Sequence, residues 1–541
     1  MASRTRFAPI GVLMCLIAVI AGMIMGACPA FACTAVYVGK DASADGTTII
    51  AKSNDYQAVW PNYVEVTERV ENEPGRAMPI DNGKTVLAPL PDTTYRYTST
   101  PWMDSATATN GLAHDATVCA NEYGVVMEMS ITSFSNKAAL AADPLIEHGL
   151  SEFTAVDLVI CQSATAREAV EVLCGLIDEY GSSEVNIAFI ADQQEVWYVE
   201  MYSGHQYAAV KLPTDKVSAF GNEFSLEFAS DYADSIFSAD LTSLPEQEGF
   251  AQYGADDKAS ELNLRETYAG PETRTDYSHM RTWIGHQLLA GGYGEYRIDD
   301  EYPLCFDPDQ KVSLQDMMQI IRNRFEGTEY APDETRRTDM RVIGTDTALS
   351  VHIAQIYPDL PASRSCVTWE SAGPAIYGVF VPVSNAVTSI SEPYNANQSA
   401  GGKGTFDTER YPYYAFKALC TLCVEPNCCK TYGSPVRDYW NKVEGELVAG
   451  MGKLLQGTKS LDDAEAAKRI TEYCNRSQEQ AFSDAKTLLN DVMYYMNSNS
   501  NTLKNGRNPE TGEVLDELRE LKPLEVKLDS SAYALSSPEE E

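Results

Sequence analysis

The stretch PAFACTAVYVG, residues 29–39, joins an apolar leader to a segment with β-strand alternation and places a cysteine at the junction. The leader has a cationic start, an uncharged apolar run over residues 10–25, and the small-x-small triplet Ala30-Phe31-Ala32 of a signal peptidase site. We therefore expect residues 1–32 to be a signal peptide. Cleavage after this triplet would make Cys33 the first residue of the mature protein.

Two other interpretations of the leader stay open. The apolar run is near the short end of the ~17–25 residues that span a bilayer, so a retained membrane anchor is one alternative. Lipidation of Cys28, in a weak lipobox formed with Met25, is the other. Because no second apolar segment of spanning length follows, we expect the exported chain to be secreted or cell-surface associated, with no membrane contact after the signal is removed.

The composition is that of a globular protein with an acidic surface. Of 541 residues, 44% are hydrophobic, and the formal net charge is −37. Nucleic acids and anionic membranes would be repelled by this charge, so neither is expected as a partner. The charge favours solubility and says little about chemistry.

The sequence contains thirteen cysteines, and four of them crowd into CTLCVEPNCC, residues 420–429. A C-x2-C pair followed by two adjacent cysteines lacks the second spaced pair of a zinc ribbon. An exported chain can oxidise its thiols, so disulfides are favoured here over zinc, with their pairing open.

The first part of the mature chain alternates between strand and helix patterns. A strand over 33–38, a turn over 39–46 and a strand over 47–53 open it. One or two helices follow over 154–180 and end at Gly181, and a strand meander covers 185–222. Ser313 and Asp316 form a capping pattern before another helix, and more strands are expected between 347 and 387.

Beyond Pro393 the pattern becomes helical. A loop over 395–404 precedes expected helices over 407–423, 434–456 and 461–498, the last after a Ser460/Asp463 cap. We therefore divide the mature chain into a catalytic domain, 33–394, and a mainly helical C-terminal region, 395–541, with an acidic tail.

A cysteine at a chain terminus has a base of its own. Its α-amine titrates near ~7.7–8.0 and its thiol near ~8.5, so the amine can accept the thiol proton at neutral pH. Cys33 is therefore a candidate nucleophile that requires no histidine.

Five segments are informative together: CTAVYVGKDASADGTTIIAKSNDY (33–56), NEYGV (121–125), YSHMRTW (277–283), RNRFEGT (322–328), and 350–383 from SVHIAQIYPDLP to VTWESAGPAIYGVFVPV. They resemble one known family, the cysteine dipeptidases of the N-terminal-nucleophile hydrolase superfamily, which are related to bile salt hydrolases and penicillin V acylases. The resemblance implies an α+β fold, a four-layer αββα sandwich, here with a helical C-terminal extension. It implies hydrolysis of the peptide bond of a dipeptide, without a cofactor or metal.

The resemblance also implies roles for individual residues. Cys33 matches the nucleophile, and Asp55 matches the aspartate that orients the terminal amine. Asn222 resembles the oxyanion donor and Arg281 the arginine that lines the nucleophile. Lys52 stands where relatives usually have arginine, which weakens the case for a two-pronged contact with substrate there.

The sequence offers little support for metal-dependent or nucleotide-binding functions. The six histidines, His114, His148, His205, His279, His286 and His352, show no metal-ligand spacing, and the chain has no Walker loop, Rossmann glycine pattern or HExxH. A same-fold acylase of bile salts or penicillin V and an inactive secreted binding protein are the alternatives. A homo-oligomer is left open.

Overall fold

The computed structural model describes residues 33–55, 62–101, 116–335, 337, 340–395, 406–424, 429–509, 511 and 513–535, apart from the side chains of residues 334, 429 and 430. The leader, His114 and the cysteines at 15, 28 and 428 lie outside these residues, so the predictions made for them are not addressed by the structure.

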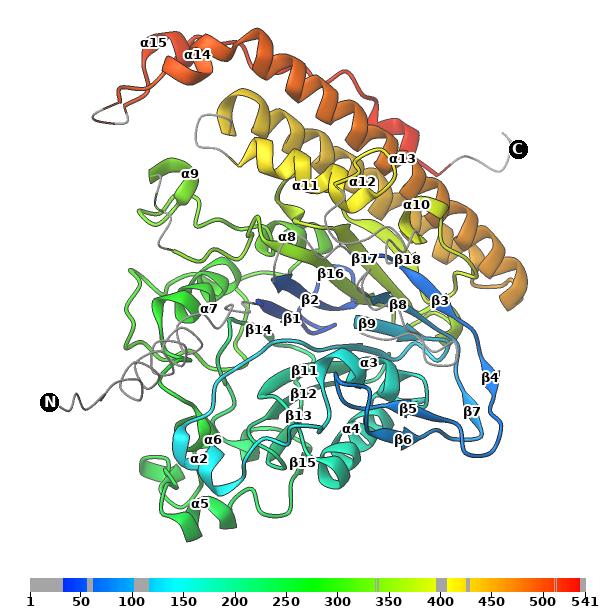
Figure 1. Cartoon of the computed structure of the whole chain (residues 1–541), viewed down its shortest axis with the longest axis vertical. Helices are drawn as coiled ribbons and strands as arrows, with labels where there is room; N and C mark the ends of the chain where they lie inside the picture. The colour runs from blue at the N-terminus through cyan, green and yellow to red at the C-terminus, as the bar shows by residue number, and fades with distance from the viewer. Residues whose placement is uncertain are drawn as a thin grey trace, which may run out of the picture.

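Two large antiparallel sheets face each other at the centre of the molecule (Figure 1). Sheet I has the order β14-β1-β2-β16-β17-β18, and its strands are β1 (Ala35–Val38), β2 (Thr48–Asp55), β14 (Val217–Phe220), β16 (Ala348–Ile356), β17 (Cys366–Ala372) and β18 (Val381–Ser384). Sheet II has the order β15-β13-β12-β11-β10-β9-β8-β3, and its strands are β3 (Glu65–Thr67), β8 (Tyr97–Pro101), β9 (Ala116–Asn121), β10 (Val126–Glu128), β11 (Asn186–Ala191), β12 (Val196–Met201), β13 (Tyr207–Lys211) and β15 (Ser235–Phe237). Two short ribbons pair β4 (Val70–Glu71) with β7 (Thr93–Thr94) and β5 (Ala77–Pro79) with β6 (Leu87–Pro89).

Helices cover the outer face of each sheet. The longest elements are α3 (Glu152–Ile160), α4 (Ala166–Tyr180), α7 (Asp276–Ala290), α11 (Pro412–Cys423), α12 (Ser434–Thr458) and α13 (Asp463–Ser498). The shorter helices are α2 (Lys137–Ala142), α5 (Ser243–Glu248), α6 (Leu264–Tyr268), α8 (Leu314–Ile320), α9 (Pro332–Thr335), α10 (Glu392–Asn395), α14 (Ser500–Asn505) and α15 (Asp516–Arg519). In Figure 1, α3 and α4 lie against sheet II, and α11 to α13 lie on the far side of sheet I.

Three hydrophobic clusters account for the layering. Strand β1 alternates: Val36 and Val38 pack toward α7 and α12, whereas Ala35 and Tyr37 face sheet II. Between the sheets the Tyr37 ring lies 6.3 Å from that of Phe189 in β11. A third cluster joins sheet II to α3 and α4. The result is the expected four-layer αββα sandwich, with the C-terminal helices built into its outer layer.

Most predicted elements are confirmed. The segment 154–180 forms two helices that end at Gly181, and Ser313 with Asp316 forms a complete capping box. The helix cap near 461 is Asp462, whose side chain accepts a bond from Glu465 N, so the predicted Ser460/Asp463 cap is wrong.

The predicted meander is also corrected at its last strand. Strands β11 to β13 follow each other in sheet II, but β14 leaves that sheet and pairs with β1 in sheet I. The alternation of 217–220 gives the strand type and contains no signal for its partner.

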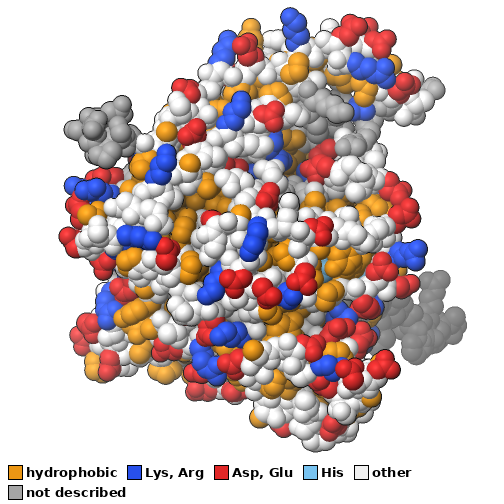
Figure 2. Space-filling view, turned by 180° about the vertical axis from the view of Figure 1, so that it is seen from behind, with side chains coloured by type: hydrophobic (Ala, Val, Ile, Leu, Met, Phe, Trp, Pro, Cys, Tyr) orange, Lys and Arg blue, Asp and Glu red, His pale blue; other side chains and the backbone are white. Residues whose placement is uncertain are grey.

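The surface carries charges of both signs. Figure 2 shows acidic and basic side chains interspersed over one face. Among the described residues, no helix has the combined length and apolarity needed to cross a bilayer.

Candidate active site

Cys33 lies two residues before β1 with 1% of its surface exposed, on the face of sheet I that packs against sheet II. The neighbouring backbone is held by β2, because Ser53 N donates to Thr34 O at 3.0 Å and Thr34 N donates to Ser53 Oγ at 3.0 Å. These bonds extend the β1–β2 pairing to the end of the described chain. Strand pairing therefore holds the backbone next to Cys33 in place.

Arg281 connects two of the sequence-predicted residues. Its guanidinium donates from Nη1 to Cys33 O at 2.5 Å and from Nη2 to Asn222 Oδ1 at 2.7 Å. A third bond, from Nε to Tyr277 O at 3.0 Å, anchors the side chain within α7. Arg281 is fully buried and contacts the candidate nucleophile's own backbone. The three predicted residues Cys33, Asn222 and Arg281 thus form one network.

Asn222 keeps one donor hydrogen that no acceptor in the described part of the chain takes. Its Nδ2 donates to Thr132 O at 2.6 Å, and its Oδ1 accepts the bond from Arg281. An amide nitrogen carries two hydrogens, so these contacts fix the orientation of the side chain and leave one N–H for an oxyanion.

The turn that carries Asn222 is packed closely on α7. A Cβ atom on Gly221 would lie 2.6 Å from Ser278 O, so only glycine fits there. Gly221 N donates to Thr282 Oγ1 at 3.1 Å, and Thr282 Oγ1 in turn donates to Glu223. Strand β14 and helix α7 therefore position Asn222 together.

Asp55 ends β2 with no exposed surface. Its Oδ2 lies 3.1 Å from Nη2 of Arg341, yet neither carboxylate oxygen accepts a well-aligned hydrogen bond from the described residues. Burial raises the pKa of Asp55, and the charges of Arg341 and Arg281 oppose that rise. The site thus contains a buried carboxylate with acceptor capacity to spare.

Lys52 acts on the site from a distance. It lies on β2 with no exposed surface, and its Nζ donates to Met129 O. Burial lowers the pKa of Lys52. No hydrogen bond is found between this ammonium and Cys33 among the described residues, so its influence on the sulfur is electrostatic.

The thiol is hard to ionise in this environment. Burial raises the pKa of Cys33 to about 11; the charge of Lys52 opposes this rise, the charge of Asp55 adds to it, and the Asp55 backbone N–H opposes it. In the unprocessed chain the Cys33 nitrogen is a peptide amide, which cannot accept the thiol proton. Ionisation at neutral pH therefore requires a base within reach of the sulfur.

A layer of buried titratable groups extends from Lys52 across the space between the sheets. Glu128, Glu152, His352 and Glu370 have between none and 3% of their surface exposed. Burial raises the pKa of Glu128 to about 8, a rise that Lys52 opposes and Glu370 increases. Burial also lowers the pKa of His352 well below its usual range.

Sequence reasoning missed Arg341 and this layer. The only sequence signal for Arg341 is the basic run RRTDMR, residues 336–341, and the carboxyl groups come from two strands and a helix that are far apart in the sequence. The role of Arg341 and the buried layer can be recognised only when the folded chain brings these segments together.

Two of the described histidines contact neighbouring side chains, and many of the described cysteines are thiols. His279 contacts Glu223 at 2.9 Å, and the His286 ring stacks on that of Phe306 at 3.8 Å. No cluster of three or more His, Cys, Asp or Glu side chains suited to a metal ion is found among the described residues. Thiols not bonded to another sulfur include those of Cys33, Cys119, Cys161, Cys174, Cys305, Cys366, Cys420 and Cys474.

Comparisons with known proteins agree with the resemblance seen in the sequence. The model of peptidase family C69 matches residues 32–437. The chain is 31% identical over 394 residues to "Probable dipeptidase B" of Lactococcus lactis subsp. lactis (strain IL1403), covering 69% of this chain and 78% of the relative. It is 29% identical over 374 residues to "Probable dipeptidase" of Latilactobacillus sakei, covering 67% and 76%.

A search of solved structures finds a single-residue variant of the conjugated bile acid hydrolase from Clostridium perfringens, with 10% identity and a TM-score of 0.24, covering 63% of this chain and 89% of that one. This likeness is too weak to carry an argument. The family match covers most of the chain and includes every candidate site residue. The chain therefore belongs to peptidase family C69, a family of cysteine-type peptidases.

Proposed function

We propose that this protein is an exported dipeptidase that cleaves the single peptide bond of a dipeptide through a thioester on Cys33. The observation that carries the proposal is the contact of Arg281 with both Cys33 O and Asn222 Oδ1, because it joins a terminal cysteine to an oriented amide donor. The relatives named as dipeptidases support this substrate class.

The first step is proton transfer from the thiol. A thiol with a pKa of about 11 is ionised in only about one molecule in ten thousand at pH 7. Removal of residues 1–32 would convert the Cys33 amide into an α-amine, which can take the proton. The spare acceptor capacity of Asp55 suits a role in holding that amine.

Acyl transfer then follows from the geometry. The thiolate adds to the dipeptide carbonyl, and the resulting oxyanion takes the free N–H of Asn222. Collapse of the intermediate breaks the C–N bond, and the protonated α-amine gives its proton to the departing amino acid. Water, deprotonated by the same amine, then adds to the thioester and releases the second amino acid with the thiol restored.

Export is proposed from the leader. The cationic start, the apolar run and the Ala30-Phe31-Ala32 site form a signal-peptide pattern, and cleavage there would expose the nucleophile. Cleavage of the signal peptide during secretion would then also generate the active N-terminus.

The test begins with protein recovered from outside the producing cells. N-terminal sequencing should start at Cys33, and an active enzyme with a retained extension would contradict the mechanism. Cys33→Ala should abolish dipeptide hydrolysis while leaving the melting temperature near that of the wild type. Cys305→Ala is the matched control, a half-buried cysteine outside the network that should retain activity.

A substrate panel separates the alternatives. Unblocked dipeptides should be cleaved well, and N-acetylated dipeptides and tripeptides poorly. Rapid hydrolysis of a bile salt conjugate or penicillin V with dipeptides left intact would indicate an acylase. Hydrolysis of nothing by protein that begins at Cys33 would indicate a binding protein.

A further inference from the structure

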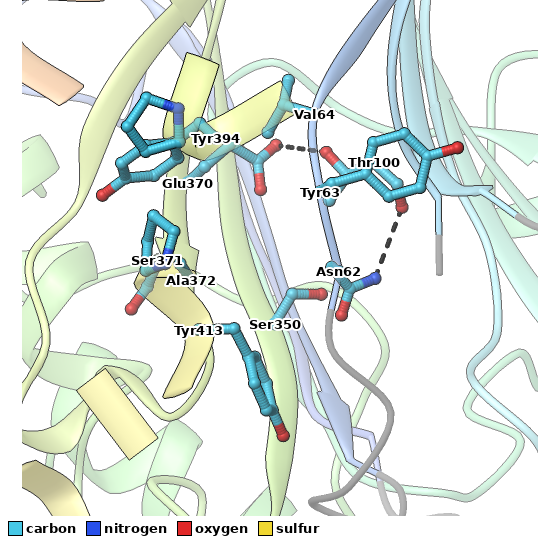
Figure 3. A pocket seen from close by; sticks show the side chains of 12 residues that line it. Asn62, Tyr63, Val64, Thr100, Ser350, Glu370, Ser371, Ala372, Tyr394 and Tyr413 are labelled. Carbon is cyan, nitrogen blue, oxygen red and sulfur yellow. Dashed lines mark hydrogen bonds between the residues drawn. The ribbon is translucent and has the colours of Figure 1, made fainter. Parts of the chain in front are cut away.

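A small pocket lies at one end of the space between the sheets (Figure 3). It is bordered by β16 and β17 of sheet I, the end of β8 in sheet II, and helices α10 and α11. The polar side chains of Thr100, Ser350 and Glu370 line it together with the tyrosines Tyr394 and Tyr413. The proposed catalytic mechanism makes no use of these groups.

The pocket contains an unpaired carboxylate oxygen. Glu370 has 3% of its surface exposed, and its Oε1 accepts a bond from Thr100 Oγ1 at 3.1 Å (Figure 3). Its Oε2 has no hydrogen-bond partner among the described residues, and neither do the hydroxyls of Ser350, Tyr394 and Tyr413. A buried carboxyl oxygen without a partner is costly, so a ligand that donates hydrogen bonds would stabilise it.

The lining of the pocket favours a cation. Glu370 is its single charged side chain among the described lining residues, and no lysine, arginine or histidine lines it. The aromatic rings of Tyr394 and Tyr413 offer apolar surface to the methylene stem of a long basic side chain, whose charged end can then reach the carboxylate. An anionic group would find no positive partner among the described lining residues.

Strand register connects the pocket to the nucleophile. The β1–β2 pairing, extended by the Thr34–Ser53 bonds, puts Cys33 opposite Asn54, and Asn54 is opposite Ser350 in β16. These three residues share the face toward sheet II, and strands lie about 4.7–4.9 Å apart, so the near edge of the pocket is about 10 Å from Cys33. Nδ2 of the intervening Asn54 is buried without a partner in the described chain.

Glu370 lies farther from the nucleophile than Ser350. It pairs with His352, which pairs with Lys52, so it is one strand beyond β16. The α-ammonium of a dipeptide lies within about one residue length, ~3.5 Å, of the scissile carbonyl and cannot reach so far. The end of a long side chain can approach it.

We propose that this pocket is a specificity subsite that takes the cationic side chain of a lysine-like or arginine-like dipeptide residue, with Glu370 as its ion-pair partner. The inference rests on the proposed dipeptidase function and adds a substrate class to it. Burial raises the pKa of Glu370 to about 8, and a bound cation would favour the ionised carboxylate.

Matched substrate pairs test the subsite. Norleucine has the straight side chain of lysine without its amine, so Ala-Lys is compared with Ala-norleucine, and Lys-Ala with norleucine-Ala. In at least one pair kcat/KM should favour lysine by about tenfold or more, as expected for a hydrogen-bonded charge pair. Glu370→Gln should bring that ratio close to one.

A control variant and distinct outcomes separate the subsite proposal from the proposed dipeptidase function. Glu128→Gln removes a carboxyl from the same inter-sheet layer outside the pocket, and it should preserve the wild-type ratio. If norleucine dipeptides are cleaved without any preference for lysine, the subsite is wrong and the dipeptidase function stands. If no dipeptide is cleaved, the proposed function fails. Glu370→Gln could instead slow free lysine and norleucine dipeptides equally and leave N-acetylated ones unaffected. That result would mean that Glu370 binds the α-ammonium of the substrate, and it would overturn the side-chain proposal.

A second measurement does not depend on the variant folding. With Ala-norleucine as substrate, n-pentylammonium should inhibit the wild-type enzyme competitively at a concentration at least about tenfold lower than 1-pentanol does. Equal inhibition by the two compounds would contradict a cation subsite.

Discussion

Arg341 places its Nη2 atom 3.1 Å from Oδ2 of Asp55 at the end of β2, and so offsets the charge of a buried carboxylate that acts on the candidate nucleophile. Burial raises the pKa of Asp55, while Arg341 lowers it. The protonation state of Asp55, and with it the capacity to bind a terminal ammonium, therefore depends on a residue far away in the sequence.

Replacing Arg341 should shift the pH profile of the enzyme. Arg341→Met removes the charge that lowers the pKa of Asp55, so this carboxyl should stay protonated to higher pH. The acidic limb of the kcat/KM profile should move to higher pH by about one unit or more. Arg341→Lys, which retains the charge, should shift the limb less. An unchanged acidic limb in Arg341→Met would show that Asp55 does not titrate in the mechanism.

Lys52 should set both the stability of the inter-sheet layer and the reactivity of the thiol. Lys52→Met removes the charge that lowers the pKa of Glu128 and Glu152, and it removes the buried hydrogen bond to Met129 O, which costs about 1–3 kcal/mol of unfolding free energy. It should also raise the thiol pKa of Cys33, because Lys52 lowers it in the wild type.

The rate of Cys33 alkylation by iodoacetamide as a function of pH measures that thiol pKa directly. Lys52→Arg retains the charge and should leave the alkylation profile close to that of the wild type. An alkylation midpoint that is the same in Lys52→Met and the wild type would contradict the electrostatic role.

Gly221 should be required for the position of Asn222. A Cβ atom there would lie 2.6 Å from Ser278 O, so Gly221→Ala must push the Asn222 turn away from α7. We expect kcat to fall by about tenfold to a hundredfold, comparable with a misplaced oxyanion donor. Gly445→Ala in α12 meets no atom within 4 Å and should leave kcat unchanged while raising stability by up to about 1 kcal/mol. Wild-type kcat in Gly221→Ala would exclude this packing as a determinant of the site.

Glu128 should make the protein less stable as the pH rises. Its pKa is raised to about 8 in the folded state, so folding favours the protonated form, and this stabilisation is lost between the unfolded value near 4.5 and about 8. Glu370 contributes in the same direction, Lys52 opposes the shift, and His352, with its Nε2 3.9 Å from Glu128 Oε1, stays neutral above pH 6.5.

Urea unfolding at pH 6.5 and pH 8 measures this effect. One pKa unit corresponds to about 1.4 kcal/mol, so Glu128→Gln should reduce the loss of unfolding free energy between these pH values by about 1 kcal/mol or more. The double variant with Glu370→Gln should reduce it further. The same pH dependence in Glu128→Gln and wild type would mean that Glu128 ionises in the folded protein as it does in water.

The sequence alone was enough for what depends on short stretches of chain. The strand, turn and strand from Cys33 to Asp55 could be read from local alternation, and the capping box at Ser313 from four residues. The resemblance located Asn222 and Arg281, which the structure brings into contact.

What depends on strand partners could not be predicted. Residues 217–220 alternate in the same way whether they extend sheet II or join β1, so the move of β14 into sheet I has no local signal. Glu370 faces the inter-sheet layer because two separate pairings put it in line with His352 and Lys52. The Asp55–Arg341 contact likewise joins segments that only the folded chain brings together.

The strand order of sheet I also has a consequence for when the site can form during synthesis. Strand β1 leaves the ribosome among the first folded segments, yet one of its neighbours is β14, and β2 must wait for β16. Contacts between such distant segments are slow to form, because the intervening chain must first be made and closed into a loop. The candidate nucleophile is thus translated early and assembled late, and nearly all of the sheet I pairing must be in place before Cys33 has its surroundings.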